Sequence, residues 1–274
     1  AHLYTVRLGL GNEDLERQIN ALPWIKVTEC DYPVKDASRI DFSRRDLRCA
    51  TIHFELKGLY GARFDGSRLD GSTLLETKLT KCSFRGASLR FCEMDGFSNM
   101  PGGLNDFTNA DVEGSYLFNL PGESLRQTKN YREKKLAGIQ LLGGLENVSF
   151  RDFSFDGILL PFQSGRLSEC EFANASLNRM AIRASLSREQ FYATVNYRRK
   201  DLSTLLFSAM RLAGWDFSGC DLAYFERCDL RDATLVNAWF VCTRASQVHV
   251  YPADAPLSIW QLFTSTGIAD IGFD

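Results

Sequence analysis

The sequence predicts an all-β solenoid, in which the chain winds into square coils that stack along one axis. Two features of a five-residue repeat predict it: large apolar residues recur at every fifth position, and a small residue precedes each one. From residue 57 the chain reads KGLYG ARFDG SRLDG STLLE TKLTK CSFRG ASLRF CEMDG. A period of five matches neither a strand nor an amphipathic helix, so the chain must turn a corner after each block.

Each block contributes one large residue to the expected core and, after the first block, one small residue two positions before it. The large residues are Leu59, Phe64, Leu69, Leu74, Leu79, Phe84, Leu89 and Met94, and the small ones are Ala62, Ser67, Ser72, Thr77, Cys82, Ala87 and Cys92. If four blocks complete one turn, residues about 20 apart stack at the strand spacing of about 4.8 Å. We therefore expect Phe64 to stack on Phe84, and Phe150 on Phe172. Phe207 should stack on Phe225, because irregular steps should be bulges or deletions that leave the coil intact.

The repeat resembles the pentapeptide-repeat family, whose signature is A-(D/N)-L-x-x. The motif occurs as Ala110-Asp111-Val112, Cys220-Asp221-Leu222 and Cys228-Asp229-Leu230. The resemblance covers about residues 40 to 242, with interruptions. It implies a right-handed quadrilateral β-helix, in which helical inserts act as spacers between stacks of coils. Periodicity alone does not give the handedness.

Two similar segments interrupt the repeat. Residues 120–138 read LPGESLRQTKNYREKKLAG, and residues 186–204 read LSREQFYATVNYRRKDLST. Ser187 followed by Gln190 is a capping-box pattern, so each segment should open with a short helix. The expected organisation is an N-terminal cap of a short helix and a strand, first coils, two modules of helical insert plus coils, and a helical or irregular C-terminal cap. Their ranges are 1–37, 38–119, 120–184, 185–246 and 247–274.

Composition excludes several classes of function. The chain has a formal net charge of −2 and 24% charged residues, which argues against nucleic-acid binding. No apolar run is long enough to span a membrane. Cysteine pairs at zinc-site spacing are absent, so we expect no metal or other cofactor. Cys82, Cys92, Cys170, Cys220 and Cys228 occupy small inward positions and are expected to be reduced core residues.

The sequence shows no catalytic constellation. His53 has no serine or carboxylate partner that can be named, and the Gly9-Leu10-Gly11 segment lacks the context of a dinucleotide loop. The charged residues are expected to be structural. Asp65 should meet Arg85, and Asp70 should meet Arg90, on adjacent coils.

We expect function to lie in the inserts and caps, because exposed segments on a rigid scaffold commonly bind partners. Tyrosine, tryptophan and arginine are frequent anchors of interfaces. The candidate partner-binding residues are therefore Arg132, Tyr192, Arg198, Trp260 and Phe263. The alternative for Tyr131 and Tyr197 is that they pack on the coil as structural plugs.

The favoured function is a non-enzymatic protein-interaction scaffold whose partner is unknown, with a terminal cap as the candidate contact for a homodimer. Two alternatives follow from the family resemblance. Some members are recognition modules of bacterial secreted effectors. Others imitate DNA and bind type II topoisomerases, which requires a long acidic face. Free cysteines and the lack of a signal peptide favour the cytoplasm, with secretion as an effector as the alternative.

Overall fold

Each side of a coil is a short extended segment that pairs with the same side of the next coil. The computed structural model describes residues 29–31, 41–53, 59–75, 78–97, 102–136, 138–143, 145–155, 167–182, 186–230, 233–236, 238–240, 245–246, 248–249 and 271–272. They belong to two compact units, Ala1–Val148 and Ser149–Asp274. The division lies inside the expected 120–184 module, and the module boundaries remain predictions. Most of the expected caps lies outside the described residues.

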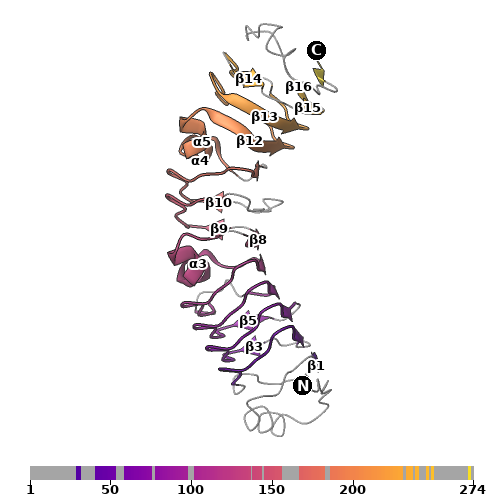
Figure 1. Cartoon of the computed structure of the whole chain (residues 1–274), viewed down its shortest axis with the longest axis vertical. Helices are drawn as coiled ribbons and strands as arrows, with labels where there is room; N and C mark the ends of the chain where they lie inside the picture. Colours follow the sequence, from indigo (N-terminus) through magenta and orange to yellow (C-terminus); the bar gives the residue numbers. More distant parts are fainter. Residues whose placement is uncertain are drawn as a thin grey trace. The chain divides into compact units, whose positions relative to one another are not determined.

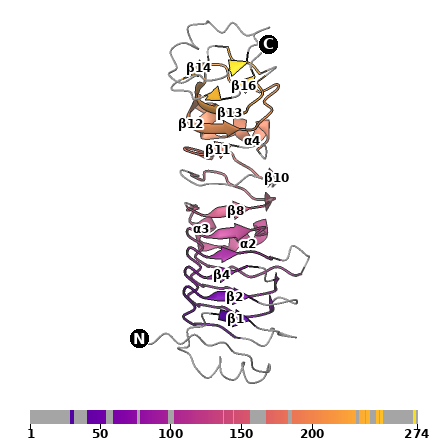
Figure 2. The same cartoon turned by 90° about the vertical axis from the view of Figure 1, so that its right-hand side faces the viewer.

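The first unit stacks its coils through parallel strand pairing (Figure 1). Its strands are β1 (Glu29–Asp31), β2 (Thr51–His53), β3 (Leu59–Tyr60), β4 (Thr73–Leu74), β5 (Leu79–Thr80), β6 (Glu93–Met94), β7 (Tyr116–Phe118), β8 (Gln140–Leu142) and β9 (Leu145–Glu146). One sheet has the order β1-β2-β4-β6-β7-β8 (Figure 2), and β3 pairs with β5. Leu59 pairs with Leu79, and Leu74 with Met94. This register confirms four blocks per turn in this part of the chain.

The corners between the sides of a coil require a left-handed backbone conformation, which glycine adopts most readily. Gly66 and Gly86 turn one corner in successive coils with φ of 63° and 62°. In the next coil Asn109 turns the corner with φ of 61°. Asparagine is among the few other residues that tolerate this left-handed conformation. Unlike glycine, it brings a side-chain amide to the corner.

A column of phenylalanine rings fills one side of the first unit's core. Phe42 stacks on Phe64 with ring centroids 4.8 Å apart, Phe64 on Phe84 at 4.9 Å, and Phe84 on Phe107 at 4.9 Å. All four side chains are buried. The spacing equals the strand spacing, so the main-chain ladder and the ring stack are in register. The expected Phe64–Phe84 pair is confirmed.

The second unit keeps this construction despite irregular steps. Its strands are β10 (Leu167–Ser168), β11 (Ala181–Ile182), β12 (Asp201–Ser208), β13 (Asp221–Glu226), β14 (Trp239–Phe240), β15 (Ala245–Ser246), β16 (Val248–His249) and β17 (Ile271–Gly272). One sheet runs β11-β12-β13-β14, with β15 also on β13, and β16 pairs with β17. The register between β12 and β13 shifts between Leu202 and Leu206. This shift absorbs the shortened step before Phe225, so the coil stays intact, as predicted.

The remaining expected ring pairs also form in the second unit. Phe150 and Phe172 have centroids 5.3 Å apart, and Phe207 and Phe225 are 5.0 Å apart. The small inward positions are occupied as expected, because Cys82, Cys92, Cys170, Cys220 and Cys228 are all buried free thiols.

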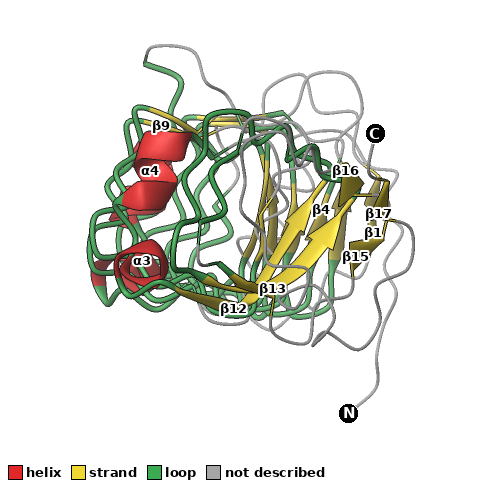
Figure 3. Cartoon of the chain, turned by 90° about the horizontal axis from the view of Figure 1, so that it is seen from above, coloured by secondary structure: helices red, strands yellow, loops and turns green. Residues whose placement is uncertain are grey.

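Two helical hairpins replace parts of coils. They are α2 (Gly122–Gln127) with α3 (Lys129–Arg132) in the first unit, and α4 (Arg188–Tyr192) with α5 (Val195–Arg198) in the second. Viewed along the coil axis, α3 lies across the first unit from the sheet that contains β4 (Figure 3). The helical inserts expected from the sequence are confirmed.

Truncating a stacked ring should destabilise the protein far more than truncating an exposed one. Phe84→Ala should cost about 3–5 kcal/mol in unfolding free energy, because it leaves a cavity between two neighbouring rings. Tyr60→Ala is the control, since this side chain is 49% exposed, and it should cost less than about 1 kcal/mol. Denaturant unfolding of both variants measures the difference. Equal losses would contradict the stacked core.

Candidate functional site: the helical inserts and the coil walls

The two inserts fold through matched caps. Thr128 and Thr194 precede the second helix of each hairpin, and each hydroxyl accepts a hydrogen bond from the backbone N–H of the tyrosine three residues later. The same hydroxyls donate to Leu125 O at 2.8 Å and Phe191 O at 2.7 Å. Both threonines are fully buried. They join the two helices of each hairpin at a fixed angle.

The first helices begin differently in the two inserts. Ser187 and Gln190 form the predicted capping box, with each side chain bonded to the other residue's main chain. The Gln190 amide also donates to Leu167 O and Cys170 O at 2.8 and 2.9 Å, which ties α4 to the coil before it. In α2, the N-cap residue Pro121 makes no side-chain capping bond. The capping signal therefore predicts α4 better than α2.

An asparagine in each hairpin takes over the main-chain ladder of the preceding coil. The Asn130 carbonyl oxygen accepts from Val112 N at 2.7 Å, and that of Asn196 accepts from Leu177 N at 2.7 Å. Their amide groups donate to Asp111 and Asn178. Gln127 O still accepts from Asn109 N at 3.0 Å, but Val112 N and Leu177 N have a side-chain acceptor in place of a strand carbonyl, and a buried unpaired N–H is costly. The side-chain amide supplies the missing acceptor.

Two tyrosines perform the same task on the other side of the second insert. Asp216 N donates to the Tyr192 hydroxyl at 2.5 Å, and the Tyr197 hydroxyl donates to Asp216 O at 2.8 Å. The two rings are stacked with centroids 4.1 Å apart. Burial is the largest of several effects that raise the pKa of Tyr197, so its phenol stays protonated and keeps donating. The two hydroxyls therefore give the main chain of Asp216 the hydrogen-bond partners that a neighbouring strand would provide.

These contacts give structural roles to residues that were candidates for binding. Tyr192 is half-buried and its hydroxyl is used within the chain, so little of its surface faces solvent. Tyr197 packs against Phe191 and the following coil, which is the structural role that the alternative for it predicted. Tyr131 is half-buried as well. Trp260 and Phe263 lie outside the described residues.

The matched arginines are the last residues of α3 and α5, and both are exposed. The Arg132 guanidinium donates to the side-chain oxygen of Asn109, and Arg198 donates to that of Asn174 at 2.5 Å. Both asparagines turn corners of the preceding coil, with φ of 61° and 58°. Sequence analysis did not single them out. An asparagine at a corner in the coil before each insert is the signal that could have revealed them.

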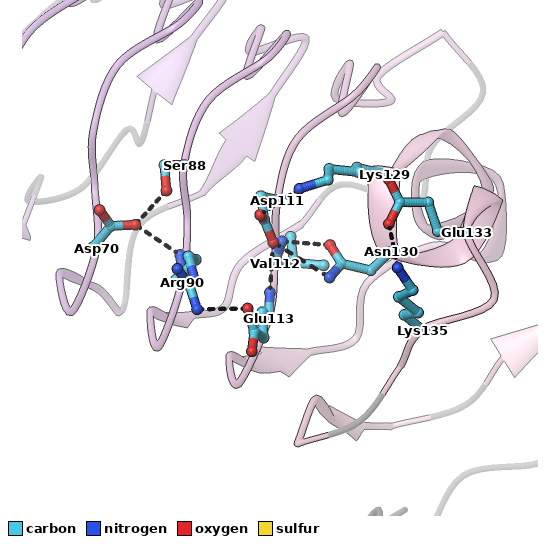
Figure 4. A network of polar contacts seen from close by, with 10 residues as sticks. All are labelled: Asp70, Ser88, Arg90, Asp111, Val112, Glu113, Lys129, Asn130, Glu133 and Lys135. Carbon is cyan, nitrogen blue, oxygen red and sulfur yellow. Dashed lines mark hydrogen bonds and ion pairs between the residues drawn. The ribbon is translucent and has the colours of Figure 1, made fainter. Parts of the chain in front are cut away.

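The coil walls carry charges that neutralise one another (Figure 4). Asp70 accepts from the Ser88 hydroxyl and from Arg90 N at 3.2 Å, while the Arg90 guanidinium reaches Glu113 at 2.6 Å. Lys129 pairs with Asp111 at 3.0 Å. These are exposed pairs, worth about 0–1 kcal/mol each, and within each pair the two charges compensate one another.

The expected Asp65–Arg85 and Asp70–Arg90 ion pairs need correction. Asp65 accepts from Arg85 N at 3.2 Å, as Asp70 does from Arg90 N, so each carboxylate binds main chain instead of the guanidinium. The Arg85 guanidinium turns to Asp106 at 3.1 Å, one coil further on. The short aspartate side chain reaches only the main-chain N–H of the adjacent coil. The longer arginine side chain extends to a carboxylate of the coil after that.

The repeat geometry agrees with the comparison to known families. Residues 59–96 match the family model described as pentapeptide repeats, in eight copies. This part of the chain consists of pentapeptide repeats. Its fold is the right-handed quadrilateral β-helix that the resemblance implied. Pentapeptide-repeat proteins are generally non-enzymatic scaffolds.

The chain is also similar to solved structures at low sequence identity. HetL, a pentapeptide repeat protein involved in heterocyst differentiation regulation in the cyanobacterium Nostoc, is 17% identical over 90% of this chain and 84% of its own, with a TM-score of 0.13. QnrB1, a plasmid-mediated fluoroquinolone resistance protein, is 15% identical over 72% of this chain and 92% of its own, with a TM-score of 0.19. Scores this low carry no argument about function. No curated protein matches the chain.

Among the residues that the structure describes, no group of three or more histidine, cysteine, aspartate or glutamate side chains could hold a metal ion. No described helix is long and apolar enough to cross a membrane. His53 lies in β2, and residues 9–11 lie outside the described ranges.

Replacing an insert asparagine should show how much the ladder depends on it. Asn196→Ala leaves the buried Leu177 N–H without its acceptor and should lower the unfolding free energy by about 1–3 kcal/mol. Asn178→Ala is the matched control, because Asn178 is half-buried and its side-chain oxygen accepts from the amide group of Asn196. Its loss should be smaller. Denaturant unfolding measures both, and the reverse order would contradict the proposed role.

The core cysteines should react slowly with thiol reagents. Burial raises the pKa of Cys82, Cys92 and Cys220 to about 11, so little thiolate exists at neutral pH. Cys49 is exposed and should be alkylated first. Time-resolved iodoacetamide labelling with peptide mass spectrometry assigns each rate. Rapid native labelling of most core thiols would contradict their assignment as reduced core residues.

Proposed function

We propose that the chain is a non-enzymatic protein-interaction scaffold, and that its partner binds the outward sides of the two helical inserts. The observation that carries this proposal is the matched docking of both hairpins. In each, a buried threonine joins the two helices, an asparagine ties them to the preceding coil, and an arginine at the end of the second helix stays exposed. Side chains that project from rigid elements suit specific recognition.

The coil walls support the proposal by contrast. Arg63, Arg85 and Arg90 each lie within 4.0 Å of a carboxylate from the same wall. Such walls repeat one pattern of paired charges from coil to coil, and repetition gives little specificity. The inserts interrupt that pattern and bring side chains that the coils lack.

An imitation of DNA fits the described walls less well. A DNA-like surface requires a long run of uncompensated acidic side chains. Here Asp41, Asp106 and Glu113 each have a guanidinium within 4.0 Å. The effector alternative differs from the main proposal in cellular context only, since an effector recognition module would also be a protein-binding scaffold. A homodimer through a terminal cap remains a prediction about residues outside the described ranges.

Partner capture by the full chain tests the proposal. The immobilised wild-type chain should capture a protein that Arg132→Ala/Arg198→Ala captures at least about tenfold less, the loss typical of interface anchors. The wall variant Arg85→Ala/Arg90→Ala is the matched control and should capture within about twofold of wild type. Circular dichroism melting checks that both variants fold. Capture that survives the insert changes but not the wall changes would place the binding surface on the coils.

A further inference from the structure

The two matched arginines are held differently from the coil-wall arginines that form ion pairs. Arg132 and Arg198 each donate to a neutral asparagine oxygen. Within the residues that the structure describes, neither guanidinium forms an ion pair with a carboxylate. Arg63, Arg90 and Arg151 in the coils all do, with N–O distances of 3.4, 2.6 and 3.2 Å. The insert arginines are therefore fixed in place but keep their charge.

The asparagine that Arg198 contacts is itself oriented. The Asn174 amide group donates to Asp152 at 3.0 Å, which leaves its carbonyl oxygen facing Arg198. A guanidinium carries five N–H donors, and one hydrogen bond to an asparagine leaves the others available. An arginine that is fixed through one of its own N–H groups still presents the other N–H groups to a ligand. Its side chain then loses less conformational entropy when the ligand binds.

Local charge points to the sign of the ligand. Both inserts are net basic, although the whole chain has a formal net charge of −2. Residues 120–138 contain five basic and two acidic residues, and residues 186–204 contain four basic and two acidic residues. Arg199, next to Arg198, is exposed as well. The rest of the chain is therefore net acidic and surrounds two basic patches.

We propose that Arg132 and Arg198 are carboxylate receptors that bind acidic segments of a protein partner. This inference rests on the proposed scaffold function and names the chemistry of its ligand. A planar guanidinium fork binds a carboxylate with two parallel hydrogen bonds. Nucleic acid offers anions too, but a long polyanion needs a continuous basic surface, and it would be repelled by the acidic remainder of this chain. Short acidic peptide segments match small basic patches.

Binding of a fluorescent oligoglutamate peptide to the full chain tests the inference, with oligoglutamine as the uncharged probe. Anisotropy should show binding of oligoglutamate only, weakening as salt rises. Arg132→Gln/Arg198→Gln should weaken it about tenfold, as expected for a lost charged hydrogen-bonded pair. Arg63→Gln removes a guanidinium that is already paired in the wall and should leave affinity within about twofold.

A second pair of variants separates recognition from structure. Asn109→Asp keeps Arg132 and places a carboxylate beside its guanidinium, and aspartate also tolerates the left-handed corner. It is compared with Arg132→Gln, and Asn174 is left unchanged because its amide donates to Asp152. Both variants should weaken peptide binding to the same extent, while the melting temperature of Asn109→Asp stays at or above that of wild type. If Arg132 were only structural, Asn109→Asp would bind the peptide like wild type.

The outcomes distinguish this inference from the scaffold function. If oligoglutamate fails to bind, or binds all variants equally, the carboxylate assignment is overturned, even where the full chain still captures a protein partner. If a single-stranded oligonucleotide binds more tightly than the peptide and is lost in the same variants, the partner class is wrong. If insert variants change neither peptide binding nor partner capture, both proposals fail together.

Discussion

The structure depends on continuity of the main-chain ladder between coils. Every coil side presents N–H and C=O groups to the next coil, and these groups are buried with the core. Leaving one unpaired costs about 1–3 kcal/mol, so an insert can interrupt the coil only if it replaces the lost partners. The hairpins do this with side chains: the Asn130 and Asn196 oxygens accept from one neighbouring coil, and Tyr192 and Tyr197 bond the main chain of another.

The same ladder determines how charge is distributed on the walls. Stacking places side chains of successive coils about 4.8 Å apart, so an arginine finds a carboxylate one coil away. Asp41, Arg63, Ser83 and Asp106 pair through their main chains in successive coils along one wall, and the Arg63 guanidinium lies 3.7 Å from the Asp41 carboxylate. Lys129 at the start of α3 still pairs with Asp111. The arginines that end α3 and α5 form no ion pair among the described residues and bond an asparagine instead.

Much of the fold was predictable because one constraint repeats. The five-residue period predicted the stacking of Phe64 on Phe84, the buried cysteines and the positions of both inserts. The exact partners of the polar side chains were not predictable. The register determines which residues stack. The length and direction of the side chains decide whether Asp65 binds the guanidinium or the main-chain N–H of Arg85. The roles of Asn109 and Asn174 depended on a contact between a corner and a distant helix end, which no local pattern encodes.

The residues shared by the two inserts divide according to whether the ladder requires them. The threonines cap a helix and the asparagines supply main-chain acceptors, so folding alone accounts for both. The arginines bond only another side chain, at an exposed position where water could serve Asn109 and Asn174 equally well. Ladder continuity therefore does not explain why both copies have arginine there. A fixed and exposed guanidinium without an ion-pair partner is suited to bind a carboxylate from another molecule. The proposed recognition of a partner therefore explains these two arginines better than folding alone does.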